Sequence, residues 1–305
     1  MDRSLQHLPQ RSETDEKAGP LSGALRLLPF FSFALKRWGY YLLLLLLAVP
    51  FLLPLLWMVV TAFKPAGQIY GDALSWLPNP PTTENFSEAW SLLDFPAFMR
   101  NSLLVTGLSM LGTLFSSSLV GYAFATLPAR HKNLLFTILL ATVMIPSSVT
   151  LIPLFVLFSK LDWVNTYLPL IVPHFFANAF YVFLFRQFYR SLSPHLFESA
   201  EIDGCNPWQA YWWIALPLSR PALATVAVFS FIGSWNDFLG PLIYLSSTSK
   251  FTLSLGLSLF HGLFYTQLQY LMPMSLVALL PVLLLFVVAQ RYVVQGIVTT
   301  GEKEG

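Results

Sequence analysis

Six long apolar runs dominate this sequence. They cover residues 40–62, 103–127, 134–158, 168–185, 221–245 and 269–290. Each is about 18 to 25 residues long, the length that an α-helix needs to cross a bilayer. They lack the short alternating pattern of an outer-membrane barrel. Asp237 is the only Asp, Glu, Lys or Arg inside any of them. The chain is therefore predicted to be all-α, a polytopic membrane protein with six transmembrane helices.

The composition agrees with residence in a membrane. Charged residues make up 10% of the chain and hydrophobic residues 55%, whereas a soluble domain carries about 25% charged residues. Lipid must therefore be part of the solvent of this protein. There is no basic stripe with interleaved aromatic residues, which excludes nucleic acid as the expected partner. Cys205 is the only cysteine, so an internal disulfide and a multi-cysteine metal site are excluded.

The distribution of Lys and Arg predicts the orientation. With both termini on one side, 13 of the 17 Lys and Arg residues fall on that side. The remaining four are Lys64, Arg100, Lys160 and Lys250. Basic residues gather on the cytoplasmic side of membrane proteins, so both termini are predicted to be cytoplasmic. The outer segments are then residues 63–102, 159–167 and 246–268.

Three regions are expected along the chain. Residues 1–35 form a cytoplasmic N-terminal extension without stable structure, because the first part of it holds mixed charges and few apolar groups. Residues 36–300 form the six-helix membrane domain. Residues 301–305 form a cytoplasmic tail.

The longest inward connection, residues 186–220, is predicted to form two short helices. Ser193 is placed to cap the first helix, and Gly204 to end it in a turn with positive φ. Asn206 caps the second helix, with Gln209 three residues later in a capping-box arrangement. A surface hairpin that only covers helix ends remains an alternative for this segment.

A motif within the same connection resembles the signature of permease subunits of ATP-binding-cassette (ABC) importers. In that family the signature is Glu-Ala-Ala, three residues, Gly, nine residues and Ile-x-Leu-Pro. The matching residues here are Glu198-Ser199-Ala200, Gly204 and Ile214-x-Leu216-Pro217. The spacing agrees throughout, and Ser199 replaces one small residue by another.

Further strings are similar to the carbohydrate-uptake branch of that family. They are Asn101-Ser102-Leu103, Asn165-Thr166-Tyr167, Leu184-x-Arg186-Gln187-Phe188, Arg220-Pro221-Ala222-Leu223-Ala224-Thr225, Trp235-Asn236-Asp237-Phe238 and Gln290-Arg291-Tyr292. The chain most resembles the six-helix permease of maltose-type and glycerol-3-phosphate-type importers, over about residues 36–300. The resemblance implies the type I ABC importer permease fold, with a cytoplasmic coupling helix inside residues 186–220.

The resemblance also implies a function and partners. The chain would form half of the translocation pathway of an ATP-driven sugar importer in the inner membrane of a prokaryote. Its partners would be a pair of ATP-hydrolysing subunits that bind ATP and Mg, a second homologous permease and an extracytoplasmic solute-binding protein. The residues implied to couple to the ATPase are Glu198, Ser199, Ala200, Asp203, Gly204, Ile214, Leu216 and Pro217.

No residue pattern in the chain indicates nucleotide binding, metal binding or catalysis. A phosphate-binding loop needs Gly-Lys followed by Ser or Thr, and no lysine here follows a glycine. No His, Cys and carboxylate cluster indicates a metal site, and no set of Ser, His and Asp indicates catalysis. The chain is therefore predicted not to be an enzyme and to hold no cofactor. His174, alone in the fourth run, is expected to be hydrogen-bonded inside the bundle rather than to carry protons.

Two regions keep two interpretations each. Trp235, Asn236 and Asp237 suit a sugar pathway, because an aromatic face and polar groups fit a sugar ring; in the alternative, Asp237 caps or pairs within the bundle. The resemblance implies that the outer segment 246–268 lies near the solute-binding protein and probes its opened cleft. In the alternative, this segment forms a re-entrant helix that seals the outer gate.

Other kinds of transporter are the competing interpretations. A permease for a non-sugar solute in the same importer superfamily shares most of these motifs. A secondary transporter driven by an ion gradient predicts inverted repeats and several embedded carboxylates, whereas the runs contain one carboxylate. A membrane scaffold without a transport role leaves the coupling signature without a purpose.

Overall fold

The computed structural model describes the backbone of residues 21–71, 75–262 and 266–301, and the side chains of residues 39–71, 75–262 and 266–290. The chain divides into two compact units, Met1–Trp57 and Met58–Gly305. Over the described residues there are helices and no strand, apart from an isolated bridge between His261 and Thr266. The all-α prediction is confirmed.

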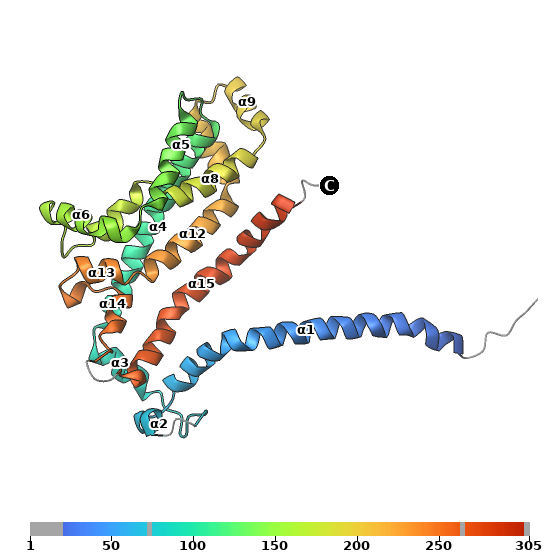
Figure 1. Ribbon diagram of the computed structural model, residues 1–305, viewed down its shortest axis with the longest axis vertical. Helices are drawn as coiled ribbons and strands as arrows, with labels where there is room; N and C mark the ends of the chain where they lie inside the picture. Colours follow the sequence, from blue (N-terminus) through green and yellow to red (C-terminus); the bar gives the residue numbers. More distant parts are fainter. Residues whose placement is uncertain (1–20, 72–74, 263–265, 302–305) are drawn as a thin grey trace, which may run out of the picture. The chain divides into compact units, whose positions relative to one another are not determined.

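The first unit contains most of the long helix α1 (Leu21–Ala62), drawn in blue in Figure 1. The apolar stretch Gly39–Ala62 has a mean hydropathy of 2.7, and none of its most apolar window is buried. A helix this apolar and this exposed requires lipid around it. The helix begins at Leu21, so residues 21–35 are helical and differ from the expected unstructured extension. This stretch is mostly apolar, unlike the residues before it, and residues 1–20 lie outside the described part of the chain.

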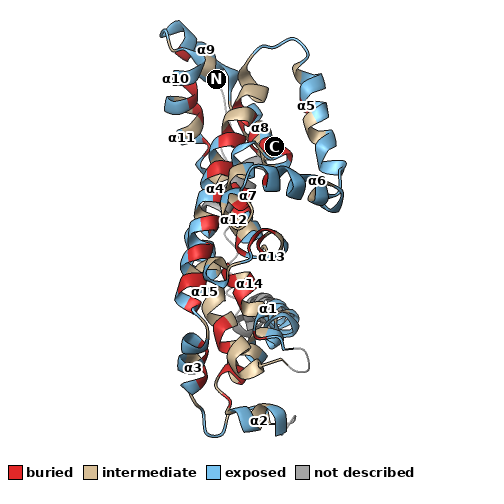
Figure 2. Ribbon diagram, turned by 90° about the vertical axis from the view of Figure 1, so that its left-hand side faces the viewer, coloured by how far each residue is buried: buried red, intermediate tan, exposed pale blue. Residues whose placement is uncertain are grey.

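The second unit is built around α4 (Phe95–Thr126), which follows the short helices α2 (Ala66–Gly71) and α3 (Glu84–Leu92). Asp94 caps α4, since its carboxylate accepts a hydrogen bond of 3.2 Å from the backbone N–H of Ala97. Helix α4 packs against α8 (Ala179–Ser191) and α12 (Arg220–Trp235). Buried residues run along much of its length in Figure 2.

Small residues let the neighbouring helices approach α4 closely. Buried on α4 are Asn101, Ser102, Thr106, Ser109, Gly112, Thr113, Ser116, Ser117, Ser118 and Gly121. A Cβ atom on Gly121 would lie 2.6 Å from the Cβ of Phe185 on α8. Gly112 meets the ring of Phe175 in the same way. Each of these aromatic side chains therefore occupies the space that a larger residue on α4 would need.

The predicted third run is bent in the middle. It forms α5 (Lys132–Ala141), the 3₁₀ turn η1 (Thr142–Met144) and α6 (Ser147–Lys160), with an angle of 95° between its two halves. Ile145 is extended at the break, with φ −80° and ψ 115°. Pro146 accounts for this, because a proline disfavours helical backbone in the residue before it.

The fourth and fifth runs are also interrupted. The fourth is α7 (Leu168–Ile171), the 3₁₀ turn η2 (Val172–Phe175) and α8, which Asn178 caps through hydrogen bonds from the N–H groups of Phe180 and Tyr181. The fifth run, expected over 221–245, is two helices: α12 ends at Trp235, and α13 (Leu239–Tyr244) follows after a gap. The side chain of Asp237 lies in that gap and caps α13, as described below.

Residues 246–260 fold onto the bundle. They contain the 3₁₀ turn η4 (Thr248–Lys250) and α14 (Leu253–Ser258), and α15 (Leu268–Gly301) comes later in the chain. The N–H of Leu253 donates a 2.6 Å hydrogen bond to the hydroxyl of Ser102, and Gly256 lies against the ring of Phe98. Over residues 251–260 this packing favours the interpretation of a helix that closes the bundle rather than a projecting probe.

Six membrane crossings fit these elements. Within the described residues, four stretches without a sharp bend are long and apolar enough to span a bilayer. Two bent pairs, residues 132–160 and 207–235, bring the number to six when each is counted as one span. The predicted six-helix fold is confirmed at the upper end of this count. The third run is bent, and the helix of the fifth run ends at Trp235 rather than at residue 245.

Candidate functional site: the 186–220 loop and a cleft beside Trp235

The 186–220 loop lies at one end of the second unit, opposite α3 (Figure 1). Its first helix, α9 (Pro194–Ile202), starts with a proline, which needs no hydrogen-bond partner at that position. Ser193 precedes it, but its side chain makes no capping hydrogen bond, contrary to the prediction. Gly204 follows the helix with φ +82°, as predicted. A Cβ there would meet nothing within 4 Å, so this position requires glycine for its backbone conformation alone.

The second helix of the loop starts with the predicted capping box. The side chain of Asn206 accepts a 2.8 Å hydrogen bond from the N–H of Gln209, whose own side chain accepts a 2.9 Å bond from the N–H of Asn206. Helix α10 (Pro207–Ala210) continues into the π-helical turn η3 (Tyr211–Ala215) and the short helix α11 (Leu216–Leu218). The sequence predicted one helix here. A proline cannot donate a backbone hydrogen bond, and Pro217 lies just after the wider turn.

The signature residues separate into an outward and an inward group. Exposed to solvent are Glu198, Ser199, Asp203, Gly204 and Pro217. Ala200 is buried, and Ile214 and Leu216 are half-buried. The imidazole Nδ1 of His195 lies 3.0 Å from a carboxylate oxygen of Glu198, one helical turn away. The loop therefore presents acidic groups outward on helices that small and apolar residues attach to the bundle.

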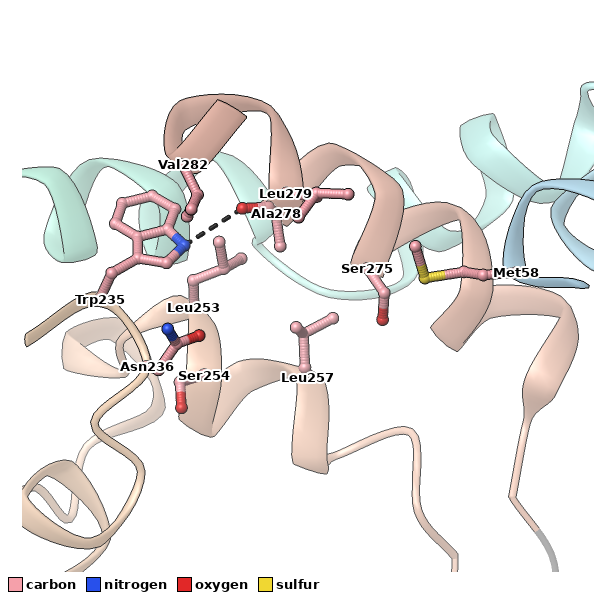
Figure 3. Close-up of a pocket in the computed structure, with 10 residues that line it drawn as sticks. All are labelled: Met58, Trp235, Asn236, Leu253, Ser254, Leu257, Ser275, Ala278, Leu279 and Val282. Atoms are coloured by element: carbon pink, nitrogen blue, oxygen red, sulfur yellow. Dashed lines mark hydrogen bonds between the residues drawn. The ribbon is translucent and has the colours of Figure 1, made fainter. Parts of the chain in front are cut away.

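A cleft of about 380 Å³ lies beside Trp235 (Figure 3). Its lining comes from Met58, Trp235, Asn236, Leu253, Ser254, Leu257, Ser275, Ala278, Leu279 and Val282. The amide of Asn236 donates a 3.0 Å hydrogen bond to the carbonyl oxygen of Ile232, which leaves its side-chain oxygen available. The hydroxyl-bearing Ser254 and Ser275 add polar groups to an otherwise apolar wall.

The predicted triplet Trp235, Asn236 and Asp237 does not act as one unit. Trp235 and Asn236 line the cleft, but Asp237 does not. Its carboxylate accepts a 3.1 Å hydrogen bond from the N–H of Gly240 and so caps α13. Of the two interpretations for Asp237, the capping one agrees with the structure. His174 is likewise in hydrogen-bond contact inside the bundle, 3.3 Å from the hydroxyl of Thr113.

Asn165 connects its own segment, residues 159–167, to residues 246–250, a role that the sequence did not predict. Its side-chain oxygen accepts hydrogen bonds from the N–H groups of Ser246 and Ser247, at 3.2 and 3.1 Å. Its carbonyl oxygen accepts a 2.6 Å bond from the ammonium group of Lys250. Asn165 has φ +59°, a conformation that asparagine tolerates better than most residues. The Asn-Thr-Tyr string was the only signal for it in the sequence.

Residues 117–297 match the model of a protein family described as the binding-protein-dependent transport system inner membrane component. The chain belongs to this family. The match covers the 186–220 loop, the cleft residues Trp235 and Asn236, and helix α12 between them. As a member of this family the protein is a multi-pass inner-membrane permease subunit of an ABC importer and not an enzyme. The importer resemblance expected from the sequence is confirmed.

Similar proteins cover more than four fifths of the chain. The arabinooligosaccharide transport system permease of Halalkalibacterium halodurans is 33% identical over 82% of this chain and 90% of its own length. The diacetylchitobiose uptake permease of Streptomyces coelicolor is 31% identical over 82% and 83% of the two chains. The lactose transport permease of Rhizobium radiobacter is 30% identical over 84% and 93%. These relatives place the permease in the carbohydrate-uptake branch.

The fold is also that of a solved importer. A chain of a bacterial ABC transporter that imports the acidic polysaccharide alginate matches with a TM-score of 0.75, over 86% of this permease and 98% of that chain, at 20% identity. A permease of this kind works with a second permease, ATP-hydrolysing subunits and a solute-binding protein. The predicted classes of partner subunit are therefore confirmed.

Proposed function

We propose that this permease carries a sugar inward and receives the energy for transport through the 186–220 loop. Named relatives carry arabinooligosaccharides, diacetylchitobiose and lactose, which supports a sugar as the cargo. In this proposal both termini face the cytoplasm, and the partner subunits bind ATP and Mg. A permease for a different solute in the same superfamily remains the competing proposal.

The geometry of the 186–220 loop is the observation that carries the coupling role. Helix α9 exposes Glu198 and buries Ala200 toward the bundle, and the exposed Asp203 follows its last residue, Ile202. The sharp turn at Gly204 and the capping box after it give α9 and α10 fixed ends. Two short helices joined by a fixed turn can move as a rigid body, which is what a contact with an ATPase subunit needs in order to transmit force. The loop is therefore proposed to dock on the ATPase subunit through its exposed acidic face.

The cleft beside Trp235 is proposed as part of the sugar pathway. The free side-chain oxygen of Asn236 and the hydroxyls of Ser254 and Ser275 offer hydrogen bonds to sugar hydroxyls, and the apolar wall suits the C–H faces of a ring. Asp237 is not assigned a contact with the sugar, because its carboxylate caps α13.

A pair of substitutions at Gly204 tests the coupling role. Gly204→Ala adds only the cost of a Cβ at positive φ, about 1 kcal/mol, since the space around it is open. Gly204→Asp adds a further charge to the proposed docking face. In proteoliposomes with the complete importer and loaded binding protein, we expect near-normal transport for Gly204→Ala. For Gly204→Asp we expect loss of the ATPase subunit or of stimulated ATP hydrolysis, at normal abundance of the permease.

Two results would contradict this proposal. Wild-type transport by Gly204→Asp would show that the loop does not dock on the ATPase. Uptake of amino acids or polyamines, without uptake of any sugar in a panel of di- and oligosaccharides, would exclude a sugar as the cargo. The second result would leave the coupling role intact, so the two parts of the proposal are tested separately.

A further inference from the structure

Three buried tyrosines lie where the 186–220 loop meets the membrane helices. Tyr122 comes from α4, Tyr189 from α8 and Tyr211 from the π-helical turn η3. Their side chains are 4%, 1% and 1% exposed. The ring centroid of Tyr122 lies 5.8 Å from that of Tyr189 and 5.3 Å from that of Tyr211. We refer to these three residues as the tyrosine cluster.

Tyr122 contacts both helices of the loop. Its ring packs against Phe197 of α9, with 6.0 Å between the centroids. Its hydroxyl donates a 3.1 Å hydrogen bond to the carbonyl oxygen of Pro207, the first residue of α10. The residues between these two contacts include the signature glycine, Gly204. One side chain of α4 therefore connects to the loop on either side of its turn.

The packing around this connection is incomplete. A cleft of about 370 Å³ lies beside it, lined by Leu119, Tyr122, Ala123, Leu127, Asn206, Pro207, Trp208 and Tyr211. Apolar side chains do not fill the space between α4 and α10. The attachment of α10 to α4 therefore depends more on the hydrogen bond of Tyr122 than it would if the two helices were closely packed.

The other two hydroxyls anchor the rest of the segment. Tyr211 is 2.7 Å from the hydroxyl of Ser118 on α4, a fully buried pair. Tyr189 donates a 3.3 Å hydrogen bond to the hydroxyl of Ser219. Ser219 is completely buried and lies between α11 and α12, where the chain bends by 77°. The start, the middle and the end of residues 207–219 are thus each held by a hydrogen bond of one tyrosine.

We propose that the tyrosine cluster is the joint that transmits movement between residues 194–219 of this loop and helices α4 and α8. Its members are positioning residues: they contact neither the sugar nor ATP. Movement of a docked loop is useful only if α4 and α8 follow it, and three separate hydrogen bonds prevent the loop from turning alone. This inference rests on the proposed docking of the loop on the ATPase subunit. It assigns the residues through which movement passes from the docked loop to the membrane helices.

The ratio of ATP hydrolysed to sugar transported tests the joint. The complete importer is reconstituted in proteoliposomes with loaded binding protein, and both rates are measured. Tyr122→Phe keeps the ring and removes only the hydroxyl. We expect this ratio to rise by about fivefold, which corresponds to the loss of one hydrogen bond. The double variant Tyr122→Phe with Tyr211→Phe is expected to raise the ratio further than either single variant.

Tyr181→Phe is the matched control. Tyr181 also lies on α8 and packs against the same buried cluster of residues. Among the described residues its hydroxyl makes no hydrogen bond, so the same chemical change removes no contact of that kind. We expect this variant to keep the wild-type ratio. Abundance of the permease and co-purification of the ATPase subunit are measured for every variant, because a purely structural role would change these and not the ratio.

Two outcomes would overturn the inference. One is a wild-type ratio in Tyr122→Phe and in the double variant. The other is a loss of abundance with an unchanged ratio in the protein that remains, which would make the cluster a folding element only. In either case Gly204→Asp still reports on the docking of the loop, so failure of the joint and failure of the docking proposal give different results.

Discussion

The indole N–H of Trp235 donates a 3.1 Å hydrogen bond to the carbonyl oxygen of Ala278, which joins the end of α12 to α15. Trp235 is 5% exposed and stacks on Phe231, with 5.4 Å between the ring centroids. An indole held in this way has little freedom to turn toward a ligand. Its neighbour Asn236 is exposed and keeps a free side-chain oxygen at the cleft.

Substitutions of these two neighbours should therefore have different effects. Trp235→Phe removes the hydrogen bond and leaves a space beside α15, so we expect a loss of stability of about 1–3 kcal/mol. Asn236→Ala should leave stability within about 0.5 kcal/mol and lower the transport rate at saturating loaded binding protein. Thermal unfolding in detergent and transport in proteoliposomes measure the two effects. Normal transport by Asn236→Ala would remove the cleft from the sugar pathway.

Two substitutions of Asp237 distinguish its role as a helix cap from a requirement for its negative charge. Asp237→Asn keeps a side-chain oxygen for the N–H of Gly240, whereas Asp237→Ala does not. We expect the Asn variant to keep wild-type stability and transport, and the Ala variant to lose about 0.5–2 kcal/mol, the usual cost of removing a cap. The measurement is the thermal unfolding midpoint of each purified variant. Equal loss of transport in both variants would instead show that the negative charge is required.

Close packing of α4 on α8 predicts that Gly121 tolerates no larger residue. In Gly121→Ala the new Cβ would lie 2.6 Å from the Cβ of Phe185, so the helices must separate. We expect destabilisation of about 1–3 kcal/mol, as for overpacked cores. Gly107→Ala is the control on the same helix, because a Cβ there meets nothing within 4 Å. Similar unfolding temperatures for the two variants would contradict the close approach of these helices.

The proposed orientation is tested by labelling single cysteines. Ser87 on α3 and Asn133 on α5 are both exposed and lie in segments that the orientation assigns to opposite sides. In a background with Cys205→Ser, a cysteine in place of Ser87 should react with an impermeant thiol reagent added to intact cells. One in place of Asn133 should react only after the membrane is permeabilised. The reverse labelling pattern would invert the topology.

Local features of the 186–220 loop were predicted from the sequence with success. The capping box of Asn206 and Gln209 and the positive φ of Gly204 are both present. They depend on residues no more than a few positions apart, so backbone geometry and side-chain length fix them without the rest of the chain. The cap at Ser193 was the exception: its position before Pro194 suited a cap, but its side chain makes no such hydrogen bond.

The breaks inside the apolar runs were harder to predict. Hydropathy measures how strongly a segment prefers lipid to water, and it contains no information about where the helix axis bends. The runs 134–158 and 221–245 were therefore expected as single helices, although Pro146 and Asp237 marked the points where they break. The sequence showed that Asp237 places a carboxylate in an apolar run, where it needs a polar partner. It did not show that this partner is the backbone N–H of Gly240.

The sequence by itself determined that the chain is an all-α membrane protein of the ABC importer permease family, because apolar length and motif spacing are properties of consecutive residues. Only the tertiary structure decided which side chains connect these parts. Tyr122 and Pro207 are 85 positions apart, and Ser118 and Tyr211 are 93 positions apart. Trp235 and Ala278 are separated by 43 positions. Such pairs meet only when the helices pack, since a hydroxyl or an indole N–H in the sequence does not specify its acceptor.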